Sequence, residues 1–129
     1  MSRAEASRAE VVSLHDVDPV ELPMGSWSRL LVTEHTVTGN SSTLGYSVFK
    51  PGLVAADLSH SVEELAFVVG GDGVIRLEDG QLEVHAGEAL FIPAGMWHSV
   101  VNDADTDLVM VFSFPSPDYP ATKRREPRK

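Results

Sequence analysis

The sequence predicts a single all-β domain, folded as a sandwich or a barrel. The chain has 129 residues, which suits one domain, and 43% of them are hydrophobic, which is enough to fill a core. Short runs rich in Val, Ile, Leu and Phe recur along the chain, and Gly and Pro separate them. The sequence shows no sustained helical period after Thr33. Many short strands with frequent turns between them are typical of β-sandwiches and β-barrels.

The chain divides into three predicted regions. Residues 1–24 form a lead-in, in which Val11–Leu14 is a candidate edge strand that could pair within its own chain or be exchanged with a partner chain. Residues 25–115 form the barrel. Residues 116–129 contain three prolines and a basic end, and they predict an extended, partly mobile tail. The predicted strands are Arg29–Thr33, Leu44–Lys50, Val54–Ser59, Leu65–Val69, Val74–Glu78, Leu82–His85, Ala89–Ile92, His98–Asn102 and Leu108–Phe114.

Charge and composition narrow the classes of function. The chain has 10 basic and 19 acidic residues, a net charge of −9 that disfavours nucleic acid as a partner. It has no cysteine, so thiolate ligands and cysteine nucleophiles are excluded. No apolar run approaches the ~20 residues of a membrane span, and no apolar leader segment begins the chain. We therefore expect a cytoplasmic protein that does not bind membranes.

Three side chains could form a metal site inside the barrel. Alternate residues of a strand share one face, so His60 lies on the face of Leu58, and His98 on the face of Val100. Glu64 opens the next predicted strand after a short turn. Two imidazoles and a carboxylate suit Fe(II), Mn(II), Ni(II) or Zn(II), and leave coordination positions open. A lone strand histidine is nevertheless often only structural, and spacing alone does not decide between these interpretations.

Two motifs resemble those of the cupin family. One carries the pattern Gly, then Pro-x-Gly, then His, then Asn, at Gly87, Pro93, Gly95, His98 and Asn102. The other follows Pro51-Gly52 and reads His, then Glu, then an aromatic residue and a Gly turn, at His60, Glu64, Phe67 and Gly71. The resemblance implies a jelly-roll β-barrel with His60, Glu64 and His98 as metal ligands. Glu63 is the competing register for Glu64.

The resemblance departs from the family at one ligand. The first motif of cupins has His-x-His, but Leu58 stands at the first position here. The site then has three protein ligands, or a fourth comes from His35 or His85. A cupin that has lost its metal is the remaining alternative.

The resemblance implies a metal-dependent enzyme that acts on a small organic molecule. Three free coordination positions would admit a chelating substrate and O₂, so we expect a mononuclear Fe(II) dioxygenase, with Mn, Ni or Zn as alternatives. A non-redox lyase, isomerase or cyclase is the second interpretation, and a non-catalytic ligand-binding cupin the third. A homodimer is expected, because an open sheet edge needs cover. The expected substrate-binding residues are Leu58, Phe67, Trp97, Val100 and Asn102.

Overall fold

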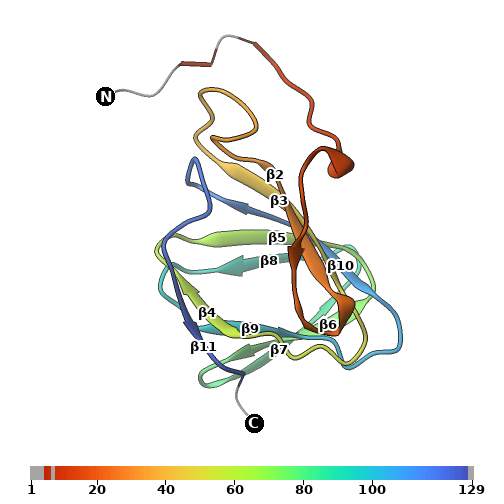
Figure 1. Cartoon of the computed structure of the whole chain (residues 1–129). Helices are drawn as coiled ribbons and strands as arrows, with labels where there is room; N and C mark the ends of the chain where they lie inside the picture. The colour runs from red at the N-terminus through yellow and green to blue at the C-terminus, as the bar shows by residue number, and fades with distance from the viewer. Residues whose placement is uncertain (1–4, 7, 128–129) are drawn as a thin grey trace.

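Two antiparallel β-sheets face each other and enclose the core, as a barrel requires (Figure 1). The computed structural model describes residues 5–6 and 8–127, and the predicted all-β class is confirmed. The six-stranded sheet has, in spatial order, β1 (Val20–Glu21), β2 (Trp27–Val32), β3 (Thr43–Phe49), β10 (Leu108–Phe114), β5 (Glu64–Gly70) and β8 (Ala89–Ile92). The five-stranded sheet has β11 (Thr122–Arg125), β4 (Asp57–His60), β9 (His98–Val101), β6 (Asp72–Leu77) and β7 (Gly80–His85). Two short 3-10 segments, η1 (Leu14–Asp16) and η2 (Pro23–Gly25), precede β2.

The predicted strands all overlap observed ones, but β1 and β11 were not predicted and several strand bounds differ. The strand predicted over Val54–Ser59 is β4, which begins at Asp57. Val54 makes only an isolated bridge to Val101. The predicted Asp79-Gly80 hairpin turn lies one residue earlier, because Leu77 pairs with Gly80. Glu78 and Asp79 therefore form the loop, and neither has a positive φ.

Strand β10 shows how the side-chain pattern builds the core. Its residues alternate between buried and half-buried, so every second side chain points inward. Leu108 and Phe114, at the two ends of this inward row, are 0% and 1% exposed. Burying each such side chain stabilises the fold by roughly 1.5–3 kcal/mol.

Gly45 makes room for an aromatic ring in this core. It lies directly opposite Phe112 in the β3–β10 pair. A Cβ atom at Gly45 would collide with the end of the Phe112 ring. The absence of a side chain at Gly45 therefore lets the ring fill the space above β3.

The lead-in packs against its own chain. The Arg29 guanidinium donates to the backbone carbonyls of Leu14 and Val17, at 3.3 and 2.6 Å. Val20 and Glu21 then pair with β2 as the edge strand β1. The intrachain edge strand thus lies after the predicted Val11–Leu14 segment, in which Val11 is 93% exposed.

The tail contributes a strand to the barrel. Thr122–Arg125 pairs with β4, and the two lie side by side in Figure 1. The carbonyl of Pro117 accepts hydrogen bonds from the backbone N–H of Glu34 and the side chain of Asn40, each at 2.8 Å. Thr122–Arg125 is therefore extended, as predicted for the tail, but it forms a strand of the barrel, which the predicted division at residue 115 did not include.

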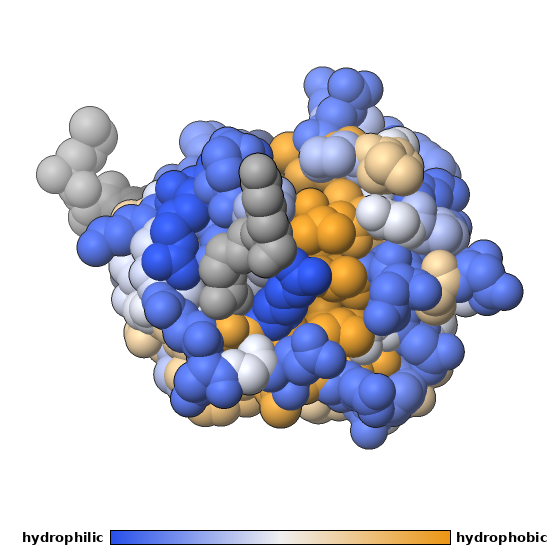
Figure 2. Space-filling view, turned by 90° about the horizontal axis from the view of Figure 1, so that it is seen from below, coloured by the Kyte–Doolittle hydropathy of each residue, from blue (hydrophilic) through white to orange (hydrophobic). Residues whose placement is uncertain are grey.

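Apolar side chains also reach the surface. Seen from below, the molecule exposes an apolar strip bordered by polar side chains (Figure 2). On the outer face of the six-stranded sheet, Leu65 and Phe91 lie opposite each other and are 48% and 57% exposed. Phe67 on the same face is 48% exposed.

No helix in the described part of the chain has the length and apolar character needed to cross a membrane.

Candidate metal centre

His60 closes strand β4 and is held from behind by the tail. Its Nδ1 atom lies 2.7 Å from the Thr122 hydroxyl, which lies directly opposite on β11. The Thr122 hydroxyl donates its own proton to the carbonyl of Pro120, at 2.9 Å. The oxygen of Thr122 is therefore the acceptor, and His60 carries its proton on Nδ1. The Nε2 lone pair then points into the barrel.

His98 opens strand β9 and is oriented in the same manner. Its Nδ1–H donates to the carbonyl of Met96, at 3.0 Å, since a carbonyl oxygen can only accept. Both histidines are 4% exposed, and their ring centroids lie 5.1 Å apart. Hydrogen bonds that fix the tautomer and the ring direction of this kind are a regular feature of metal-binding histidines.

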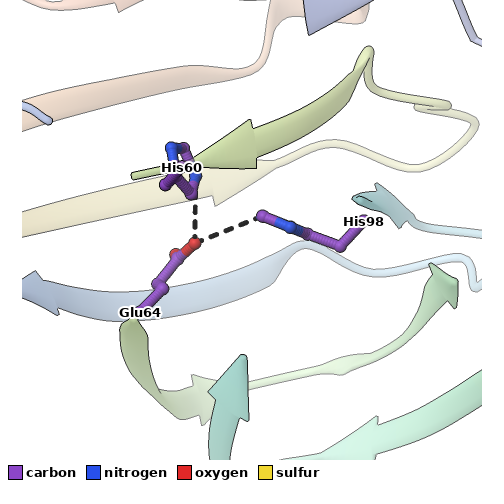
Figure 3. Close-up of side chains that lie close together, drawn as sticks. All are labelled: His60, Glu64 and His98. Carbon is purple, nitrogen blue, oxygen red and sulfur yellow. Dashed lines mark ion pairs between the residues drawn. The ribbon is translucent and has the colours of Figure 1, made fainter. Parts of the chain in front are cut away.

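Glu64 opens strand β5 and brings its carboxylate between the two rings (Figure 3). Its Oε1 atom lies 3.3 Å from Nε2 of His60 and 3.3 Å from Nε2 of His98. The neighbouring Glu63 precedes the strand, is exposed, and is not among the potential ligand atoms of this group. Glu64, and not Glu63, is thus the carboxylate that meets the two imidazoles.

A positive charge would stabilise the arrangement of the His60, Glu64 and His98 ligand atoms. With both protons on Nδ1, two nitrogen lone pairs and a carboxylate oxygen converge within 4.8 Å of one another. Three buried acceptors repel one another unless a proton or a cation lies between them. A 2-His-1-carboxylate set is also the donor set that Fe(II), Zn(II), Mn(II) and Ni(II) accept. The residues present therefore fit one divalent ion.

The ionisation of the site agrees with that charge requirement. Burial by itself would raise the pKa of Glu64, but hydrogen bonds and charges from His60 and His98 outweigh it and lower that pKa. Burial would lower the pKa of His98, but the Glu64 carboxylate and the Met96 carbonyl outweigh it and raise that pKa. The carboxylate is therefore held ionised, and the space beside it favours positive charge.

A cavity of about 530 Å³ adjoins the three side chains. Its walls are mostly apolar, and Leu58 and Val100 line it as expected. Leu58 lies directly opposite His98 in the β4–β9 pair. The cavity is large enough for a small organic molecule, and His60, Glu64 and His98 form a polar patch in its wall.

Three expected substrate-binding residues do not line this cavity. Phe67 is on the outward face of β5, because it alternates with the inward Ala66 and Val68. Trp97 lies under the Arg125 guanidinium, 3.9 Å from its ring centroid. Asn102 is fully buried and donates to the carbonyls of Phe49 and Thr106, so it has a structural role.

The two alternative histidine ligands are engaged elsewhere. His85 lies 2.8 Å from Asp72 and His35 lies 2.9 Å from Asp118, and both histidines are exposed. Within the described ranges, Glu34, His35 and Asp118 form a second group of potential ligand atoms, but it lies on the surface. Neither histidine replaces the ligand missing at Leu58.

Among the cavity residues that the sequence reasoning missed, three come from the tail: Tyr119, Thr122 and Arg124. Tyr119 packs its ring edge-on against His60, with centroids 5.7 Å apart. Polar and apolar residues alternate too weakly from residue 119 to residue 125 to predict a strand. Only the strand parity of Thr122 and Arg124, once pairing with β4 is known, indicates that both face the cavity.

The fold and the site together define a cupin. The Cupin domain model matches residues 45–114, which is more than half of the chain, and the chain belongs to this family. The chain is 30% identical over 106 residues to the polyketide synthase CurC of Streptomyces cyaneus, covering 81% of this chain and 68% of CurC. It is 35% identical over 66 residues to a gentisate 1,2 dioxygenase of Aquipseudomonas alcaligenes, covering 50% of this chain and 19% of that protein. The structure of the polyketide cyclase RemF from Streptomyces resistomycificus superposes with a TM-score of 0.77 at 22% identity, covering 95% and 89% of the two chains, which shows a shared fold.

Proposed function

We propose that this protein is a metal-dependent cupin cyclase that closes a ring in a polyketide-like substrate without redox chemistry. The main observation that supports this proposal is the convergence of His60, Glu64 and His98 on one point in the wall of an apolar cavity. The name of RemF, a polyketide cyclase, favours ring closure over the dioxygenase expected from the sequence, and the name of CurC, a polyketide synthase, agrees with a polyketide-like substrate. A bound divalent ion would supply Lewis acidity, polarising a carbonyl oxygen of the substrate.

The protein's own residues supply position and a dry environment. Thr122 and the Met96 carbonyl fix the directions of the two imidazoles. Leu58 and Val100 present apolar wall that excludes water and favours a compact, folded substrate chain. Burial raises the pKa of Tyr119, so its hydroxyl keeps its proton and serves as a hydrogen-bond donor rather than as a base.

The reaction needs no oxidant. The α-carbon of an enol in the substrate bonds to a ketone carbon of the same chain, the enol re-forms its carbonyl and releases its O–H proton, and the ketone oxygen gains a proton. Electrons and atoms balance within one molecule. Ring closure therefore proceeds equally well under argon and in air.

An Fe(II) dioxygenase is the second candidate. The match to gentisate 1,2 dioxygenase favours it, although the match covers only half of this chain. Three protein ligands would leave room for a chelating substrate and O₂ on Fe(II). A non-catalytic ligand-binding cupin is the third candidate, favoured by Leu58 at the position of a ligand.

One set of measurements separates these candidates. Elemental analysis of protein purified without added metal should find about one divalent ion per chain, and His98→Ala should lose it. The wild type, loaded in turn with Zn(II) and Fe(II), is then given a tetraketide thioester analogue under argon and, separately, gentisate in air. Anaerobic ring closure that His98→Ala abolishes supports the cyclase. Oxygen uptake with gentisate supports the dioxygenase, and full metal content in His98→Ala would overturn the ligand assignment.

We also propose that the protein forms a homodimer. The outward row of Leu65, Phe67 and Phe91 supports this proposal, because three large apolar side chains are about half exposed on one sheet face. Exchange of the Val11–Leu14 segment stays a second prediction.

A further inference from the structure

Arg124 is the one arginine or lysine among the described residues that line the cavity. It lies directly opposite Leu58 in the β11–β4 pair, as Thr122 lies opposite His60. Side chains directly opposite in an antiparallel pair share a face, so Arg124 and Leu58 are on the cavity side. Arg124 is exposed, which places it at the mouth rather than in the interior.

The neighbouring Arg125 shows what a structurally engaged arginine looks like here. Its guanidinium makes an ion pair with buried Asp57, at 2.6 Å, and lies over the Trp97 ring. In the described part of the chain, no carboxylate lies within ion-pair distance of Arg124. The donors of Arg124 therefore remain available for an anion from outside the protein.

The other polar groups of the cavity wall are committed to one another. The hydroxyls of Ser28 and Ser47 lie 2.7 Å apart and share a hydrogen bond. The Ser99 hydroxyl donates to the carbonyl of Ala55, at 2.8 Å. A polar substrate group that enters this apolar cavity thus meets the metal ligands, the Tyr119 hydroxyl and Arg124, and of these only Arg124 offers a guanidinium.

We infer that the substrate carries an anionic oxygen group, such as a carboxylate or an enolate, which Arg124 binds at the cavity mouth. This inference rests on the proposed function and adds the class of substrate. A guanidinium offers paired N–H donors that match a carboxylate. Because Arg124 is one strand repeat from Thr122, roughly 7 Å, the anion lies at the opposite end of the substrate from the group near His60. The net charge of −9 repels anions at long range, so Arg124 supplies the local attraction that an anion needs at this position.

The test uses the full-length, Zn(II)-loaded protein and two matched fluorescent probes. One is 6-hydroxy-2-naphthoate, a flat aromatic acid with polar groups at opposite ends, and the other is its neutral carboxamide. We expect Arg124→Gln to weaken binding of the acid by about tenfold or more, and binding of the carboxamide by less than about twofold. Its zinc content should remain that of the wild type.

Lys123→Gln is the matched control, because it removes the same charge from the same strand on the opposite face. It should leave both affinities within about twofold of the wild type, since a distant surface charge is largely screened. Four outcomes would overturn the inference. Both variants could lose affinity equally, or Arg124→Gln could lose none. Arg124→Gln could also lose affinity for both probes, or the wild type could bind neither probe. If Arg124→Gln selectively loses affinity for the acid, but the wild type holds no metal and closes no ring, the proposed function is overturned. The anion site at Arg124 is supported in that case.

Discussion

The hydroxyl oxygen of Thr122 accepts a hydrogen bond from Nδ1 of His60 over 2.7 Å, joining the last strand of the chain to the candidate metal centre. Because this bond sets the ring direction and the tautomer, Thr122 is a positioning residue for the candidate metal ligand His60. The tail is therefore part of the site even though it lies outside the segment that the family model matches.

Thr122→Val keeps the shape of the side chain but removes the acceptor, so we expect metal affinity to fall by about ten- to a hundredfold. Thr122→Ser keeps the hydroxyl and should retain most of the affinity. Competition with a chromophoric chelator measures both constants, and thermal melting of the metal-free variants checks that they fold. Equal affinity in the Val and Ser variants would show that the hydrogen bond does not support the ligand.

Leu58→His should strengthen metal binding by about tenfold or more, because it adds a fourth ligand to the site. Leu58 lies directly opposite His98 and lines the cavity, so an imidazole there reaches the same point. Leu58→Asn is the control, since it brings polarity without an imidazole. If both variants bind metal as the wild type does, position 58 does not face the ion.

The pH dependence of stability should differ in sign between the metal-free and metal-loaded protein. The pKa of Glu64 is lowered from its ordinary 4.5, so its contribution is present above that value and is lost as pH falls through the lowered pKa. The pKa of His98 is raised from its ordinary 6.5, so its contribution is present below that value and is lost as pH rises through the raised pKa. The metal-free pair should therefore stabilise most between these two ordinary values and less at higher pH.

A bound ion takes the place of the proton on Nε2 of His98. The stability of the metal-loaded protein should therefore increase as the pH rises over the same range. Melting temperatures measured from about pH 5.5 to 8.5, with a chelator and with Zn(II), check the two slopes. His98→Gln cannot titrate at this position and should lose the decline seen in the metal-free protein. Parallel slopes with and without metal would contradict the assignment of His98 as a ligand.

The homodimer predicts that the wild type elutes and scatters light as a particle of twice the chain mass. Phe67→Ser, on the outward face of β5, should shift it toward the monomer without loss of metal. A chain that begins at Pro23 tests exchange of the Val11–Leu14 segment, and a dimer in that chain would exclude the exchange. A wild type that runs as a monomer at high concentration would contradict both ideas.

The sequence by itself predicted the strand pattern and the three side chains that converge at the site, His60, Glu64 and His98, because both depend on residues that are close together in the chain. Alternation, turn residues and the spacing within two motifs are local properties, and they predicted the faces of Leu58 and Val100 as well. The same reasoning misplaced Phe67, because an aromatic residue in a strand is equally suited to either face of a sheet.

Tertiary structure alone decided what surrounds those three residues. Thr122 and Arg124 reach the cavity because β11 pairs with β4, more than sixty positions earlier in the chain. No local pattern encodes that pairing, since a short basic segment between prolines is equally compatible with a solvated tail. Hydrogen bonding to a distant strand edge is what turns the tail into one wall of the site.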